Sequence, residues 1–85
     1  MHNSAVARQT LVGRVGTVVV GIRGGDRPGE VRLVVEGMAH YYLAYAASPV
    51  PADTTVLVIH SRGARQIDVE PWPTLPPDGG VAEGL

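Results

Sequence analysis

The sequence predicts an all-β fold, a small closed barrel of five strands, from three observations. Valine and alanine supply most of the 45% hydrophobic content, and eleven glycines and seven prolines interrupt the chain. This composition is typical of short strands joined by tight turns. No segment has the apolar spacing of an amphipathic helix, and 85 residues provide a single core. Closure into a barrel is favoured over a sandwich because it removes exposed strand edges.

The first expected strand covers residues 13–23, where the run GRVGTVVVGIR is rich in β-branched side chains. Gly16 and Gly21 lie where a long strand would bend or carry a bulge. The run GGDRPG at 24–29 is a strong turn signal. Residues 30–36 then alternate as a half-buried strand does, and the inner face is expected to carry Val31, Leu33 and Val35.

The third expected strand is residues 38–45, MAHYYLAY, which holds all three tyrosines of the chain. Gly37 permits a tight reversal before it, so this strand should pair antiparallel with the preceding one. Because side chains alternate in a strand, the cluster divides into two faces and cannot form a single site. One face should join the core, and the other should pack beside neighbouring strands or dock a partner. One face carries His40, Tyr42 and Ala44, and the other carries Tyr41, Leu43 and Tyr45.

The last two expected strands are residues 54–60 and 64–71, with a turn at 61–63 between them. A proline-bearing connection at 47–53 precedes them and can hold one helical turn at most. The final strand alternates clearly, with Ile67 and Val69 opposite Gln66, Asp68 and Glu70.

These elements place the predicted barrel domain at residues 11–72. Residues 1–10 and the Pro/Gly-rich residues 73–85 are predicted to be flexible tails. Five strands, with a long first strand bent at its glycines, are typical of an OB-fold barrel.

Composition narrows the function classes. There are no cysteines, which excludes disulfides and thiolate metal sites. The formal net charge is −1, and all seven basic residues are arginines interspersed with acids, so no strongly basic face is indicated. No apolar run approaches the roughly 20 residues that span a bilayer, and the N-terminus lacks the apolar core of a secretory signal. We therefore expect a cytoplasmic protein with no membrane insertion of its own.

Catalytic and metal-binding residues are sparse. His60 and Ser61 are adjacent in a strand, so their side chains should diverge and not share a proton. His40 and His60 could hold a metal only on neighbouring strands, and no third ligand follows at an informative spacing. A small hydrolase would need at least two of His40, Tyr42, Asp53 and His60 in one pocket. We expect no enzyme activity and no cofactor.

The order of the motifs carries a family resemblance. The runs LVGRVGTVVVGIR, PGEVRLVVEG, VPADTTVLVIHSRG and QIDVEPW, spread over residues 11–72, resemble the C-terminal domain of the NfeD-like family. The resemblance implies a five-stranded OB-like barrel and partnership with stomatin- or flotillin-type membrane scaffold proteins. The transmembrane segments that usually precede this domain are not seen in the sequence. Asp53 stands where the family has glycine, which Asp can replace if the turn needs a left-handed backbone.

The sequence thus predicts a protein-interaction module that pairs with a stomatin/flotillin-type scaffold at the membrane face or assembles with itself. The candidate partner-binding residues are Arg32, Tyr41, Tyr45 and Trp72. Trp72 has two interpretations: a plug that caps the open end of the barrel, which is favoured, or an anchor in a partner's pocket. The alternative function is binding of single-stranded nucleic acid, with Arg32 beside stacking tyrosines. The negative net charge and the lack of lysine and phenylalanine count against it.

Overall fold

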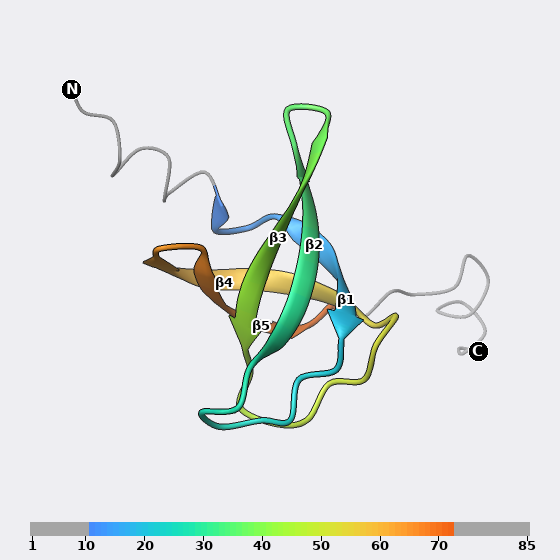
Figure 1. Ribbon diagram of the computed structural model, residues 1–85, viewed down its shortest axis with the longest axis vertical. Helices are drawn as coiled ribbons and strands as arrows, with labels where there is room; N and C mark the ends of the chain where they lie inside the picture. Colours follow the sequence, from blue (N-terminus) through green and yellow to red (C-terminus); the bar gives the residue numbers. More distant parts are fainter. Residues whose placement is uncertain (1–10, 73–85) are drawn as a thin grey trace, which may run out of the picture.

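The computed structural model describes residues 11–72, which form one closed five-stranded barrel (Figure 1). The order around the barrel is β1-β2-β3-β5-β4, and only the β3–β5 pair is parallel. The predicted all-β, OB-like barrel is confirmed. The predicted tails at 1–10 and 73–85 lie outside the described residues. The strands are β1 Val15–Val20, β2 Gly29–Val35, β3 Met38–Tyr45, β4 Thr55–Gly63 and β5 Gln66–Pro71.

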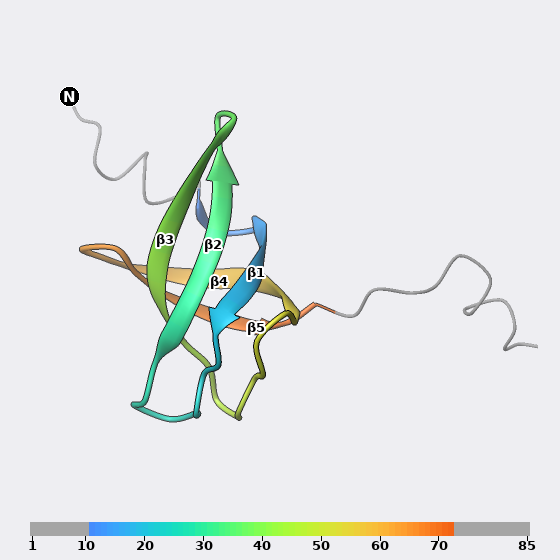
Figure 2. The same cartoon turned by 45° about the vertical axis from the view of Figure 1, so that its right-hand side comes forward.

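Two hairpins and β1 make the barrel. The β2–β3 hairpin crosses the β4–β5 hairpin, and β1 joins them by pairing with β2 on one side and β4 on the other (Figures 1 and 2). No helix within residues 11–72 is long and apolar enough to cross a membrane.

The core follows the alternation of the strands. Val31 and Leu33 of β2 and Ile67 and Val69 of β5 are buried, as their spacing predicted. Tyr42 of β3 packs against this core from a partly buried position, on the same side of the strand as Ala44. No polar or charged residue in the described part of the chain is buried. The buried apolar side chains are Val18, Ile22, Val31, Leu33, Ala44, Ala46, Val50, Val56, Val58, Ile67 and Val69.

The first strand is shorter than expected. It ends at Val20 after a register shift between Val18 and Val20, and the chain continues to a single bridge between Ile22 and Val50. Gly16 is needed because a Cβ there would overlap the side chain of Leu33 and come within 2.7 Å of the Arg32 carbonyl oxygen. The bulge thus lies between the two glycines at which it was expected, and Gly16 marks a close approach of β1 to β2.

Of the two predicted hairpin turns, the first is in place and the second was misplaced. Glu36 and Gly37 both have positive φ, as a two-residue type I′ turn requires, and the tight reversal expected at Gly37 is confirmed. The second hairpin turns at Ala64 and Arg65, also both at positive φ, and not at 61–63. The prediction failed because β4 runs on to Gly63 through two register shifts, so its Ser and Gly belong to bulges and not to a turn.

Asp53 has φ +73°, so the turn before β4 does use the left-handed backbone in which Asp can take the place of glycine.

Candidate protein-interaction surface

Strand register places three of the four candidate residues in one row around the outside of the barrel. Tyr41 of β3 pairs with Arg32 of β2, which pairs with Thr17 of β1. Thr17 pairs with Thr55 of β4, and the Thr55 carbonyl accepts a hydrogen bond of 2.9 Å from the Trp72 amide. With neighbouring strands about 4.8 Å apart, the row from Tyr41 to Trp72 extends about 19 Å over the surface.

Apolar side chains lie on both sides of this row where it crosses β1, β2 and β3. Val15 lies two residues before Thr17 in β1 and Val34 lies two residues after Arg32 in β2, which is the same side of the row because the strands are antiparallel. Val20 and Leu43 lie on the other side, where both pair with Glu30. Each of these side chains is between 43% and 54% exposed, as are Tyr41 and Val19. We call this surface the sheet face: Val15, Val19, Val20, Glu30, Arg32, Val34, Tyr41 and Leu43.

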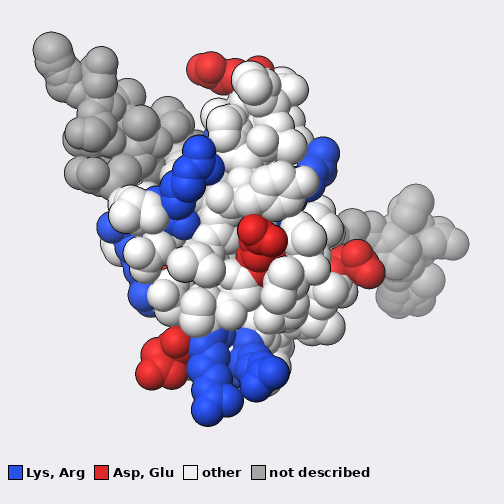
Figure 3. Space-filling view, viewed as in Figure 1, with Lys and Arg blue, Asp and Glu red and all other residues white. Residues whose placement is uncertain are grey.

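The sheet face is mostly uncharged. The view in Figure 3, which looks onto β2 and β3, shows a largely uncharged centre with single charged side chains, whereas blue side chains gather at the left edge and at the lower end. Glu30 and Arg32 are the charges within the sheet face, and neither has an ion pair or side-chain hydrogen bond within residues 11–72. An exposed apolar patch of this kind is typical of a protein-binding site.

Tyr45 does not join this surface. The guanidinium of Arg62 lies 3.8 Å from the centroid of the Tyr45 ring, and the Tyr45 hydroxyl donates a hydrogen bond of 3.4 Å to Gln66 Oε1. Arg62 is held there by two hydrogen bonds to the Asp68 carboxylate, of 3.0 and 2.8 Å. One face of the Tyr45 ring is therefore covered by the chain itself, as the cross-strand packing alternative expected.

Trp72 lies outside the buried core. Its side chain is 44% exposed, whereas the partly buried side chains that pack against the core are Leu11, Val35 and Tyr42. Both interpretations of Trp72, as a cap of the barrel and as an anchor for a partner, stay predictions.

The histidines do not assemble a catalytic centre with the other candidates. His60 Nδ1 lies 3.2 Å from Asp68 Oδ2, while Ser61 Oγ accepts a hydrogen bond of 3.4 Å from the Gly63 amide. The two neighbouring side chains thus diverge as expected. A hollow beside β4 and β5 contains His60 and Asp68 but not His40, Tyr42 or Asp53.

Asp68 is held as a carboxylate by its neighbours. The hydrogen bond from Arg62 is the main cause that lowers the pKa of Asp68, and the hydrogen bond with His60 adds to it. The same bond raises the pKa of Arg62. This arrangement links β4 to β5 on the outside of the barrel. Within residues 11–72, no three His, Cys, Asp or Glu side chains lie close enough to hold a metal ion.

A comparison with family models decides the classification. The model of the NfeD C-terminal domain matches residues 15–70, which is most of the barrel. The chain belongs to the NfeD C-terminal domain family. This confirms the resemblance seen in the sequence motifs. No curated protein matches the chain.

Two solved structures share the fold of this NfeD C-terminal domain. The C-terminal domain of stomatin operon partner protein 1510-C from Pyrococcus horikoshii superposes with a TM-score of 0.64 at 17% identity, covering 79% of this chain and 95% of that one. The soluble domain of the NfeD protein YuaF from Bacillus subtilis gives a TM-score of 0.62 at 24% identity, covering 84% and 93%. At these identities the likeness establishes the fold.

The apolar part of the sheet face was not found from the sequence. Val15, Val34 and Leu43 are outward residues in strands whose inner residues are also apolar, so alternation alone gave no reason to select them. The available signal was Val34, an outward residue of β2 that lies two residues from each of the charged residues Arg32 and Glu36. A single exposed valine is ordinary on a protein surface, so this signal was a weak one.

Proposed function

We propose that this NfeD C-terminal domain is a non-enzymatic protein-interaction module that docks a stomatin- or flotillin-type membrane scaffold protein through its sheet face. The observation that carries the proposal is the exposed apolar surface over β1, β2 and β3, with Tyr41 and Arg32 paired at its centre. Tyrosine and arginine are enriched among the residues that dominate binding energy at interfaces. One protein with the same fold is named a stomatin operon partner protein, which supports this class of partner.

The docking site is the part of the row that lies over β1, β2 and β3. The whole row from Tyr41 to Trp72 passes over all five strands of the closed barrel and therefore curves round the molecule. A typical interface covers about 800 Å² on each partner, and Tyr41 and Arg32 are the proposed anchors within the sheet face. The domain would act in the cytoplasm and reach the membrane through this partner.

Binding to a purified scaffold domain tests the proposal. We expect Tyr41→Ala and Leu43→Ala each to weaken binding by about tenfold or more, because they remove central contacts. The matched control is Ile59→Ala: Ile59 is also 46% exposed but lies on β4, which pairs with neither β2 nor β3. Equal loss with all three variants, or no binding by the unmodified chain, would refute docking through the sheet face.

The same surface also suits self-assembly, since Glu30 and Arg32 are two residues apart on β2 and could pair across a twofold axis. Sedimentation analysis distinguishes the two partners. A dimer that Leu43→Ala dissociates, without binding to the scaffold domain, would favour a second copy of this chain as the occupant.

Nucleic-acid binding is the second candidate function. The pairing of Arg32 with Tyr41 places a guanidinium beside an exposed ring, as in surfaces that stack single strands. Glu30 lies in the next row and repels phosphate. Fluorescence titration with single-stranded DNA and RNA at low salt decides the matter, because phosphate contacts would give salt-sensitive binding.

A further inference from the structure

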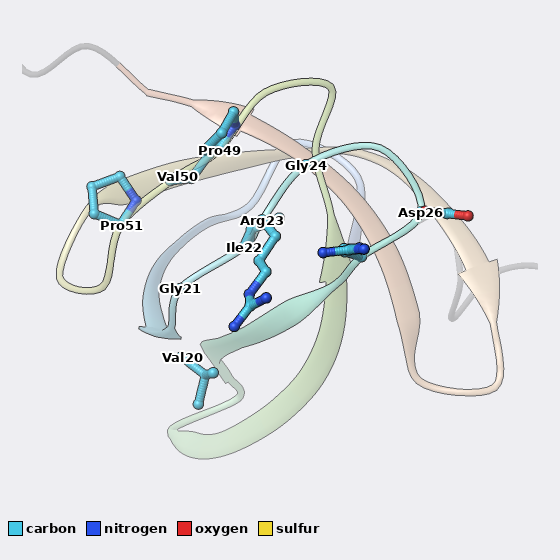
Figure 4. A pocket seen from close by; sticks show the side chains of 10 residues that line it. Val20, Gly21, Ile22, Arg23, Gly24, Asp26, Pro49, Val50 and Pro51 are labelled. Atoms are coloured by element: carbon cyan, nitrogen blue, oxygen red, sulfur yellow. The ribbon is translucent and has the colours of Figure 1, made fainter.

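A second hollow lies away from the centre of the sheet face, between the β1–β2 loop and the connection from β3 to β4. It has a volume of about 910 Å³, within the range of sites that hold small ligands or short peptide segments. Figure 4 shows the β1–β2 loop on one side and the two prolines of the other loop opposite. The lining residues that supply its apolar surface and its positive charge are Val20, Arg23, Arg27, Pro49, Val50 and Pro51.

The two loops are fixed to each other, so the hollow exists before any ligand arrives. Ile22 and Val50 exchange two main-chain hydrogen bonds of 2.8 and 2.9 Å. The Gly25 amide donates a further bond of 3.0 Å to the Ala46 carbonyl. Gly24 has φ +105°, and a Cβ there would come within 3.2 Å of Pro49, so the loops meet at a position that suits glycine. A preformed site loses little entropy when it binds.

The walls of the hollow combine apolar surface with two unpaired cations. Val20 is 54% exposed, and Pro49 and Pro51 are exposed beside it. The side chains of Arg23 and Arg27 make no ion pair or hydrogen bond within residues 11–72. Figure 4 shows Arg23 extending across the hollow towards Val20, whereas Asp26 points away from it.

This combination selects among ligand classes. Two arginines and the nearby Asp26 leave a local charge of about +1, whereas lipid surfaces are recognised by clusters of about 4–8 basic residues and nucleic acids by several phosphate contacts. Guanidinium groups bind carboxylates in two-bond geometry. Exposed valine and proline beside them provide contact for an aliphatic side chain. The charge and the apolar wall together fit an acidic peptide.

We infer that this hollow binds an extended acidic segment of a protein partner, with carboxylates on Arg23 and Arg27 and an aliphatic side chain against Val20 and the prolines. The inference rests on the proposed interaction function and adds the chemistry of the segment that is recognised. The site is distinct from the Tyr41–Arg32 centre of the sheet face, although Val20 belongs to both. A partner that covers Val20 would therefore contact both surfaces.

Selection from a random peptide library tests the inference with the full chain immobilised. We expect the recovered peptides to be enriched in Asp and Glu next to Leu, Ile or Val. A selected peptide should bind Arg23→Gln/Arg27→Gln at least about tenfold more weakly than the unmodified chain. The matched control Arg65→Gln removes an exposed arginine of the β4–β5 turn, which belongs to neither surface, and should bind within about twofold of it. In ¹⁵N spectra of the unmodified chain, the peptide should shift the amide signals of residues 21–25 and Val50.

Each other result overturns the inference. No enrichment, or enrichment of peptides without acids, contradicts the ligand class. A loss of binding in Arg32→Gln but not in Arg23→Gln/Arg27→Gln moves the site to the sheet face. Binding to phosphatidylglycerol vesicles that needs both loop arginines, without acidic peptides in the selection, assigns the site to a lipid surface.

Two measurements keep the inference separable from the proposed function. Unchanged thermal unfolding of Arg23→Gln/Arg27→Gln shows that a lost affinity is not lost folding. Failure of the scaffold domain to bind, together with a successful peptide selection, refutes the stomatin- or flotillin-type partner and leaves the acidic-peptide site in place. If the scaffold domain binds but the selection recovers no acidic peptides, the acidic-peptide site alone is refuted.

Discussion

Gly29→Ala tests the packing on which the barrel closes. Gly29 is buried at the start of β2, where a Cβ would overlap the Val20 carbonyl oxygen and lie 2.6 and 2.7 Å from the oxygen and carbon of the Gly21 carbonyl. All three atoms belong to the main chain, so no side-chain rotation relieves the overlap. β1 and β2 must separate near the Val20–Glu30 pair.

The expected cost is about 3 kcal/mol, because overpacking costs about 1–3 kcal/mol and a lost ladder hydrogen bond about 1 kcal/mol. A domain the size of residues 11–72 has a total stability of about 3–9 kcal/mol. The variant should therefore lose a third or more of its free energy of unfolding. Urea unfolding followed by circular dichroism measures this loss.

The matched control is Gly21→Ala, two residues past the bulge in β1. Its Cβ would lie 3.6 Å from the Val50 carbonyl oxygen, an ordinary contact, and Gly21 is not among the glycines with positive φ. We expect its stability to stay within about 0.5 kcal/mol of the unmodified chain. Equal unfolding midpoints for Gly29→Ala and Gly21→Ala would refute the close approach of β1 and β2.

Three further predictions concern stability. Replacing Ala64 and Arg65 by Asn and Gly should stabilise the chain by about 1 kcal/mol or more in urea unfolding, because both residues have positive φ; a lower midpoint would contradict the turn geometry. Leu33→Ala should cost about 2–5 kcal/mol by the same assay, since Leu33 is fully buried, and a loss below about 1 kcal/mol would contradict a close-packed core. The Arg62 hydrogen bond lowers the pKa of Asp68 in the folded state, so its stabilisation is complete above the ordinary carboxyl pKa, close to 4, and disappears as the pH falls through the lower folded value. Unfolding midpoints from pH 6 to 2 should therefore fall further for the unmodified chain than for Asp68→Asn, and parallel curves would contradict the shift.

The sequence predicted the barrel well because its signals were local and repeated. Alternation in 30–36 and 64–71 identified the inner residues of β2 and β5, and Gly37 identified the first hairpin turn. The second turn was misplaced because Gly63 serves a bulge, and bulges depend on how two strands pair. Local sequence does not determine that pairing.

The composition of the sheet face was only partly predictable for a related reason. The alternation of residues 38–45 correctly separated Tyr42, which packs against the core, from Tyr41, which is exposed. It could not show that Arg62 would cover Tyr45, because that contact joins β3 to β4 across the parallel β5 strand. The hollow between the two loops likewise depends on the Ile22–Val50 bridge, which connects residues far apart in the sequence.

Methyl NMR of the complex with a purified scaffold domain tests docking through the sheet face most directly. We predict that the methyl signals of Val15, Val34 and Leu43 shift or broaden on binding, while those of the exposed Ile59 on β4 stay in place. Shifts of Ile59 in a complex that leaves Val15, Val34 and Leu43 unchanged would contradict it.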